Sequence, residues 1–187
     1  MPQSHYFTRL KDCGLSEISC DYLAAALKSN RSYPRELYLS GDYNNLQDSG
    51  VKQLCVLLEN PRCRFETLRL KDCDLSEISC DYLAAALKSN PSYPRVLDLS
   101  GTYNNLQDAG VKQLCVLLEN PRCRFETLRL NHCDLSERSS EALSSGLSSQ
   151  TSNLRQLDLS NINLKDSGMK LLSEGIKTPR CTLETLK

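Results

Sequence analysis

The chain has 187 residues, and its 23 Lys and Arg residues are balanced by 23 Asp and Glu residues. A formal net charge of zero argues against a nucleic-acid-binding protein and against docking to an anionic membrane, because both depend on clustered positive charge. No apolar run approaches the roughly 20 residues that cross a bilayer, and Met1–Leu10 lacks the apolar core of a signal peptide. The sequence therefore predicts a folded, cytoplasmic protein.

Internal repetition organises the whole chain. Lys11–Leu70 and Lys71–Leu130 align without a gap, and a third, more divergent copy begins at Asn131. The first two copies differ at six positions: Gly14/Asp74, Arg31/Pro91, Glu36/Val96, Tyr38/Asp98, Asp42/Thr102 and Ser49/Ala109. Each copy is too long for one strand and one helix, so it divides into two units.

A leucine pattern marks the start of each unit. FETLRLKDCDL (Phe65–Leu75) and FETLRLNHCDL (Phe125–Leu135) follow L-x-x-L-x-L-x-x-C-x-L, and NLRQLDLSNINL (Asn153–Leu164) is a third version. Leucines alternate with polar residues in LYL, LRL and LDL, which predicts short strands with one buried face. The anchoring leucines recur at nearly even intervals, at Leu37, Leu68, Leu97, Leu128, Leu157 and Leu186.

A helix is expected after each strand. Ser76 stands where an N-cap belongs, and Glu77 follows in the first turn, where the helix dipole favours a negative charge. The expected apolar stripes are Ile78, Leu83, Ala86 and Leu87 in one helix type, and Val111, Leu114, Cys115 and Leu118 in the other, which ends at Asn120-Pro121. A single unit cannot bury both its strand and its helix, but stacked units can. The predicted fold is an α/β solenoid, with parallel strands on a concave face and helices on a convex face.

The unit boundaries follow from the leucine spacing. A degraded N-terminal segment, 1–7, in which His5 stands in the slot of Phe65, precedes the repeat domain, 8–187. Thr8 takes the place that Leu68 has in a complete unit. Six units are expected, and the chain stops in the first strand of a seventh. Their ranges are 8–36, 37–67, 68–96, 97–127, 128–156 and 157–185.

The alternating units, with their DCDLSE and LQDAGVKQLC junctions, resemble the ribonuclease-inhibitor class of leucine-rich repeats. More closely, LRLKDCDLSEISCDYLAAALKSN and LQDAGVKQLCVLLENPRCRFETLRL are similar to the C-terminal repeats of NOD-like receptors, above all the NACHT/LRR family of bony fish. That resemblance implies a horseshoe solenoid within a cytosolic innate immune sensor, where the repeats contact ligands, bind partners or hold the receptor inactive. No GxxxxGK[ST] stretch occurs in this chain, so ATP binding is not carried over to it.

The outward strand positions supply the candidate partner-binding residues. The slot between the two leucines of each strand reads Arg9, Tyr38, Arg69, Asp98, Arg129 and Asp158. From Arg69 onward the charges alternate, which predicts a ladder of ion pairs between strands about 4.8 Å apart. The next slot carries Lys11 and Lys71, with His132 beside it. The candidates for contact with a protein partner or immune ligand are Tyr38, Arg69, Lys71, Asp98, Arg129, His132 and Asp158; the alternative is a merely solvated face.

The cysteines indicate neither disulfides nor catalysis. Cys13, Cys73 and Cys133 recur every two units, about 10 Å apart by strand spacing, which exceeds the roughly 7 Å limit for a disulfide. Oxidation between Cys20 and Cys55, on adjacent helices, stays open. His132 beside Cys133 suggests a nucleophile pair, but Cys133 fits better as a buried turn residue. No metal set, cofactor motif or catalytic constellation is present in the sequence.

These observations favour a non-catalytic binding module over an enzyme. The leading interpretation is the sensing or autoinhibitory segment of a cytosolic NOD-like receptor. One alternative is a stand-alone inhibitor of the ribonuclease-inhibitor type; clamping a basic enzyme calls for an acidic concave face, whereas this one alternates in sign. The other alternative is a structural interaction scaffold.

Overall fold

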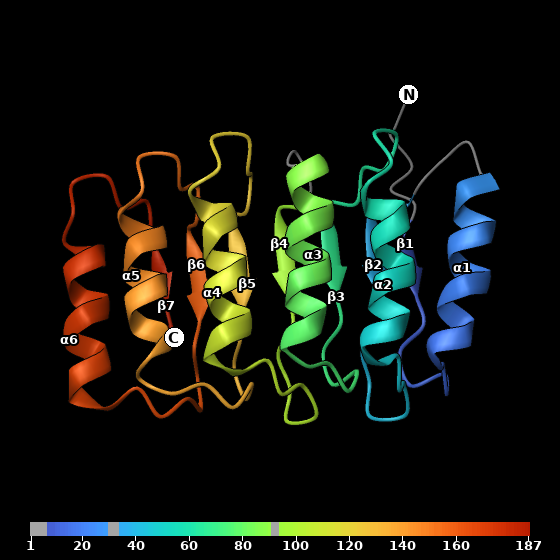
Figure 1. Ribbon diagram of the computed structural model, residues 1–187, viewed down its shortest axis with the longest axis horizontal. Helices are drawn as coiled ribbons and strands as arrows, with labels where there is room; N and C mark the ends of the chain where they lie inside the picture. The colour runs from blue at the N-terminus through green and yellow to red at the C-terminus, as the bar shows by residue number, and fades with distance from the viewer. Residues whose placement is uncertain (1–6, 30–33, 91–93) are drawn as a thin grey trace.

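The computed structural model describes residues 7–29, 34–90 and 94–187 of the chain. In these residues short strands alternate with helices from the first unit to the last (Figure 1). The strands are β1 (Phe7–Arg9), β2 (Glu36–Tyr38), β3 (Thr67–Arg69), β4 (Val96–Asp98), β5 (Thr127–Arg129), β6 (Gln156–Asp158) and β7 (Thr185–Leu186). The helices are α1 (Glu17–Ser29), α2 (Gln47–Leu58), α3 (Glu77–Ser89), α4 (Gln107–Leu118), α5 (Ser139–Ser148) and α6 (Lys165–Ile176).

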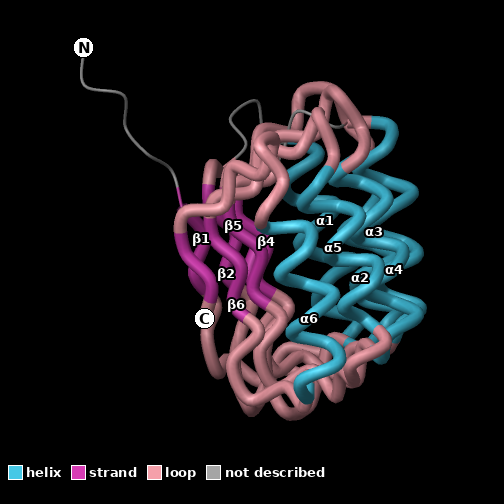
Figure 2. The backbone as a smooth tube through the Cα atoms, turned by 90° about the vertical axis from the view of Figure 1, so that its left-hand side faces the viewer, coloured by secondary structure: helices cyan, strands magenta, loops and turns pink. Residues whose placement is uncertain are grey.

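The strands form one parallel sheet in chain order, from β1 to β7. The register aligns the strand leucines, with Leu37 opposite Leu68 and Leu68 opposite Leu97. The helices lie together on one side of this sheet, and the strands line the other side (Figure 2). The predicted solenoid is therefore confirmed, with the strands on the concave face and the helices on the convex face.

Leucines from both element types fill the space between sheet and helices. The anchoring leucines of β2 to β6 are at most 1% exposed, and the stripe of α4 is buried as predicted. Ile78 departs from its predicted stripe, because 47% of its surface is exposed. It lies one full turn and part of another before Leu83, which places it about 140° around the helix from that buried position.

A buried asparagine holds the turn between strand and helix in alternate units. The Asn104 side chain is 0% exposed. Its Oδ1 accepts from the backbone N–H groups of Cys73, at 3.0 Å, and Leu75, at 3.1 Å, in the preceding unit. Its Nδ2 donates to the carbonyl groups of Leu70, at 2.8 Å, and Leu99, at 2.9 Å. This one amide therefore satisfies backbone groups of two neighbouring units, which buried polar groups require.

A carboxylate at the start of a helix joins its unit to the next. Asp48, in the first turn of α2, accepts hydrogen bonds from the backbone N–H and hydroxyl groups of both Ser76 and Ser79. Ser76 is also the N-cap of α3, and its hydroxyl accepts from the N–H of Ile78. Burial alone would raise the pKa of Asp48, but these hydrogen bonds prevail and lower it below its ordinary value.

The N-terminal prediction falls largely outside the described residues, which exclude residues 1–6 and so His5. β1 begins at Phe7, and Thr8 occupies the strand slot opposite Leu37, as expected. None of the helices in the described ranges is long and apolar enough to cross a membrane.

Candidate partner-binding face

Six strands carry their outward side chains in one row across the concave face. The sheet register places Arg9, Tyr38 and Arg69 opposite one another. The same row continues through Asp98 and Arg129 on the next strands. Asp158 of β6 follows, and the backbone of Lys187 pairs with Leu157 and Leu159 beside it. The structure therefore brings together the predicted residues of this slot.

The N-terminal half of the row is a stack of one aromatic ring between two guanidinium groups. The guanidinium carbons of Arg9 and Arg69 each lie 4.7 Å from the centroid of the Tyr38 ring. A hollow of about 510 Å³ opens over this stack, and its wall includes Lys11 and Lys71. Cation–π contacts at exposed sites contribute about 0.5–1 kcal/mol each. The stack thus fixes two positive groups beside an aromatic face.

The predicted ladder of alternating charges is formed only in part. Asp98 pairs with Arg129, whose Nη1 lies 3.7 Å from Oδ2 of Asp98. No ion pair within 4.0 Å joins Arg69 to a carboxylate in the described ranges, and its buried Nε has no hydrogen-bond partner there. Arg69 stacks on Tyr38 instead. The prediction of a continuous ladder is wrong at this position, because the guanidinium group of Arg69 lies over the Tyr38 ring. It is also wrong between Arg129 and Asp158, which form no ion pair within 4.0 Å in the described ranges.

The two aspartates of the row are held by the serines that follow them. Asp98 is only 5% exposed, and its Oδ1 accepts from the hydroxyl of Ser100 at 2.6 Å. Asp158 accepts from the hydroxyl of Ser160 at 2.7 Å. Burial alone would raise the pKa of Asp158, but these hydrogen bonds and nearby cations lower it. Both carboxylates are therefore already engaged within the chain.

The lysines of the second slot lie at the edge of the hollow. The Nζ of Lys71 lies 3.2 Å from Oδ2 of Asp72, and 51% of its side chain is exposed. Lys11 forms a similar pair with Asp12 at 3.5 Å. Exposed pairs of this kind contribute about 0–1 kcal/mol. Their ammonium groups therefore stay within reach of an incoming anionic group.

The chain is similar in sequence to several known proteins. No family model matches the chain. It is 38% identical to ribonuclease inhibitor of Mus musculus over 185 residues, which cover 99% of this chain and 39% of that protein. It is 41% identical to NACHT, LRR and PYD domains-containing protein 12 of Homo sapiens over 179 residues, 96% of this chain and 16% of that protein. Protein 14 of the same series, from Mus musculus, is 37% identical over 179 residues, 96% of this chain and 17% of that protein.

The chain is a leucine-rich repeat protein of the ribonuclease-inhibitor class. These relatives are longer, since the chain spans 39% of ribonuclease inhibitor and about one sixth of the NACHT, LRR and PYD proteins. The names of these relatives describe an inhibitor and NACHT, LRR and PYD domains, and none of them describes an enzyme.

His132 and Cys133 of this repeat protein lie in different environments. His132 is exposed at a turn with φ of +64°, and its Nε2 lies 2.9 Å from Nδ2 of Asn161. Cys133 is 0% exposed, and its Sγ donates to the carbonyl oxygen of Leu99 at 3.0 Å. Burial raises the pKa of this thiol far above its ordinary value. The interpretation of Cys133 as a buried turn residue is confirmed.

The remaining cysteines behave as small apolar residues of the repeats. All ten are free thiols, including Cys20 and Cys55, and eight of them are buried. Burial raises the pKa of Cys55, Cys80 and Cys115 to about 12. The described part of the chain has no group of three His, Cys, Asp or Glu side chains that could hold a metal ion.

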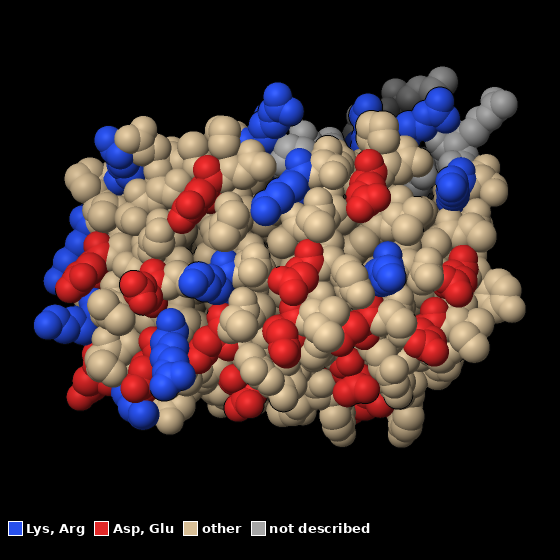
Figure 3. All heavy atoms as spheres, viewed as in Figure 1, with Lys and Arg blue, Asp and Glu red and all other residues tan. Residues whose placement is uncertain are grey.

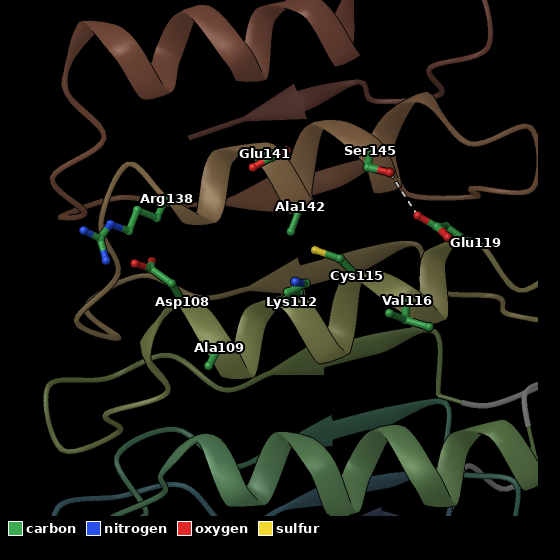
Figure 4. Close-up of a pocket in the computed structure, with 10 residues that line it drawn as sticks. All are labelled: Asp108, Ala109, Lys112, Cys115, Val116, Glu119, Arg138, Glu141, Ala142 and Ser145. Atoms are coloured by element: carbon green, nitrogen blue, oxygen red, sulfur yellow. Dashed lines mark hydrogen bonds between the residues drawn. The ribbon is translucent and has the colours of Figure 1, made fainter.

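Arg9 and Lys11 line the hollow but were not among the predicted binding residues. When the chain is shifted along itself by one full repeat copy, Arg9 coincides with Arg69 and Lys11 with Lys71. The repeat period was therefore a sufficient signal for both. A second hollow lies on the convex face between α4 and α5, and the sequence analysis did not predict it (Figure 4).

Proposed function

We propose that the chain is a protein-binding segment of a cytosolic NOD-like immune receptor, where it senses a ligand or holds the receptor inactive. Its similarity to three NACHT, LRR and PYD proteins over nearly its whole length supports this assignment. Ten free thiols suit a reducing compartment such as the cytosol. The division into six units with the ranges given above is part of the same proposal.

The observation that carries the binding proposal is the stack of Tyr38 between Arg9 and Arg69. Tyrosine and arginine are enriched among the residues that dominate protein interfaces. The ring holds both guanidinium groups in place, so less side-chain entropy is lost when a partner binds. The hollow above the stack leaves room for a partner side chain.

The charge of the concave face indicates the chemistry of the partner. Its cations are Arg9, Lys11, Arg69, Lys71, Arg129 and Lys187, and its carboxylates are Asp12, Glu36, Asp72, Asp98 and Asp158. Arg9 is paired with Glu36, whose Oε2 lies 3.3 Å from its Nη2. Asp98 is paired with Arg129, whereas Arg69 has no carboxylate within 4.0 Å in the described ranges. An acidic segment of a protein partner is therefore the best complement, since Arg and Lys bind carboxylates by charge-assisted hydrogen bonds.

Fluorescence anisotropy with a labelled oligoglutamate peptide tests this proposal. The neutral control is an oligoglutamine peptide of equal length. We expect salt-sensitive binding of the acidic peptide only, and at least about tenfold weaker binding to the Tyr38→Asp variant, a change of about 1.4 kcal/mol. The second repeat copy already carries Asp98 at the equivalent position, so the variant is compatible with the fold. Equal binding by the variant and the wild type would overturn the assignment of the stack.

Sequencing the transcript upstream of the Met1 codon tests the receptor assignment separately. An in-frame NACHT module would support it, and a stop codon directly upstream would contradict it. If such a module is present, deleting the repeats tests the autoinhibitory role. That role predicts a receptor that signals without ligand.

A ribonuclease inhibitor remains a second candidate function, because ribonuclease inhibitor of Mus musculus aligns with 99% of this chain. A ribonuclease activity assay at low salt distinguishes the two. The receptor proposal predicts full enzyme activity in the presence of micromolar chain. Inhibition at that concentration would favour the second candidate.

A further inference from the structure

The convex face has a hollow of about 430 Å³ between α4 and α5. Figure 4 shows Lys112 and Cys115 of α4 facing Ala142 of α5 across it, with Val116 beside them. The volume lies within the range of about 300–1,000 Å³ that is typical of ligand sites. This hollow is separate from the concave face of the proposed function.

The repeat itself shows what is missing from this hollow. The corresponding space one copy earlier lies between α2 and α3, where Lys52 Nζ lies 5.7 Å from the centroid of the Tyr82 ring. Tyr82 is half-buried and packs against the core. One repeat copy further along the chain, Lys112 corresponds to Lys52, and Ala142 corresponds to Tyr82. In the third repeat copy alanine therefore stands at the position where the second copy has tyrosine.

The α4 wall of the hollow is almost unchanged from the wall that holds Tyr82. α2 and α4 differ in sequence only at Ser49/Ala109, and Ala109 lines the hollow. The lysine and the valine at the wall are the same in both helices, as Lys52 and Val56 in α2 and Lys112 and Val116 in α4. The lysine that lies over a tyrosine ring in one copy is therefore presented in the next copy without that ring.

The two ends of the hollow are polar. At one end the hydroxyl of Ser145 donates to Oε1 of Glu119 at 3.0 Å. Arg138 and Asp108 stand at the other end (Figure 4). Between them Val116 is 42% exposed, close to the 49% of its counterpart Val56. Figure 3 shows that acidic and basic side chains are scattered over this helical face with neutral surface between them.

We propose that the hollow between α4 and α5 is a docking site for an aromatic side chain of a protein partner, which takes the place that Tyr82 holds in the preceding copy. The ring would lie on Ala142, with the ammonium group of Lys112 over its face. An aromatic side chain fits better than an aliphatic one because a cation above a ring face is attracted by its quadrupole. Burying such a ring also supplies much of the energy of a protein interface.

The first test uses p-cresol, which is the side chain of tyrosine, and amide NMR spectra of the whole chain. We expect a dissociation constant on the order of millimolar, as for other very small ligands. The shift changes should centre on Lys112, Val116 and Ala142. The Ala142→Tyr variant supplies the ring within the chain, so it should abolish these shift changes. Unchanged p-cresol binding in Ala142→Tyr, or no shifts at this site in the wild type, would overturn the proposal.

The matched variant is Tyr82→Ala, which should create a second site of the same kind. In this variant p-cresol should also shift the amides of Lys52 and Val56, which it leaves unchanged in the wild type. The Tyr82→Ala experiment tests the proposal even if Ala142→Tyr fails to fold. Failure of Tyr82→Ala to gain a site would contradict the argument from the repeat. As a control for the role of the ring, 4-methylcyclohexanol should bind more weakly than p-cresol, and equal binding would refute the aromatic preference.

The final arm distinguishes a protein partner from a free aromatic molecule. Displayed peptides are selected on the wild-type chain, and those that also bind Ala142→Tyr are removed. We expect the remaining peptides to be enriched several-fold in Tyr, Phe and Trp, and expect a Tyr→Ala change within them to abolish binding. Peptides without aromatic enrichment would overturn the proposal of a protein partner. Failure here leaves the concave-face proposal intact, since none of its residues is changed.

Discussion

Asn104 provides the sharpest test of how neighbouring units are joined. Asn104→Ala removes the acceptor for the N–H groups of Cys73 and Leu75 and one donor to the carbonyl of Leu70. The carbonyl of Leu99 keeps another donor, the thiol of Cys133. The cost of the change therefore lies mainly in the two buried N–H groups.

The expected loss follows from those two donors. A buried N–H without a partner costs about 1–3 kcal/mol, so Asn104→Ala should lower the free energy of unfolding by about 2–6 kcal/mol. Domains of ordinary stability unfold at about 5–15 kcal/mol, so the loss is a large part of the whole. With a slope of about 2–3 kcal/mol per molar urea, the unfolding midpoint should fall by about 0.7–3 M.

Urea unfolding followed by circular dichroism measures this loss, and Asn105→Ala is the matched control. The Asn105 side chain is exposed, and its backbone N–H keeps its bond to the carbonyl of Leu75 at 2.7 Å. The control should change stability by less than about 0.5 kcal/mol. A loss for Asn104→Ala that is no greater than that of the control would refute the reasoning.

Three further predictions follow from the structure. In the native chain Ellman's reagent should react quickly with Cys13 and Cys181 only, and with all ten thiols after denaturation, because the other eight are buried; rapid reaction of more thiols would contradict this. The lowered pKa of Asp48 means that its stabilising effect is present above the ordinary value of 3.8 and is lost as the pH falls toward the folded value. Below pH 3.8 the melting temperature should therefore fall more steeply for the wild type than for Asp48→Asn, and parallel curves would contradict a stabilising role for the hydrogen bonds from Ser76 and Ser79 to Asp48. Gly101→Ala should destabilise the chain by at least about 1 kcal/mol, measured in urea, because Gly101 has a φ of +121° and a Cβ there would collide with Asp72; wild-type stability would contradict this.

The fold was predictable because its signals are periodic. The spacing of Leu37, Leu68 and Leu97 specified both the strands and their register, and the structure confirms both. Periodicity also located the buried stripe of α4. Periodicity failed for Ile78, because this apolar residue lies about 140° around the helix from the buried Leu83 and is therefore exposed.

The candidate site was only partly predictable, because side-chain direction depends on neighbours. The row from Arg9 to Asp158 follows from the strand register alone. Whether Arg69 turns toward Asp98 or Tyr38 depends on a competition between an ion pair and a ring face, which the sequence does not resolve. The convex hollow arises from the same cause, since Ala142 is unremarkable until Lys112 is placed opposite it.

The most direct test of the concave-face proposal is to observe the arginine Nε–H resonances while oligoglutamate is added. In the described ranges the buried Nε of Arg69 and the buried Nη1 of Arg129 both lack a hydrogen-bond partner, but Nη1 of Arg129 forms an ion pair with Asp98 at 3.7 Å and Arg69 forms none within 4.0 Å. The Arg69 resonance should therefore shift most, and Tyr38→Asp should reduce that shift. If Arg69 stays unchanged while the peptide binds, acidic partners are recognised elsewhere on the molecule.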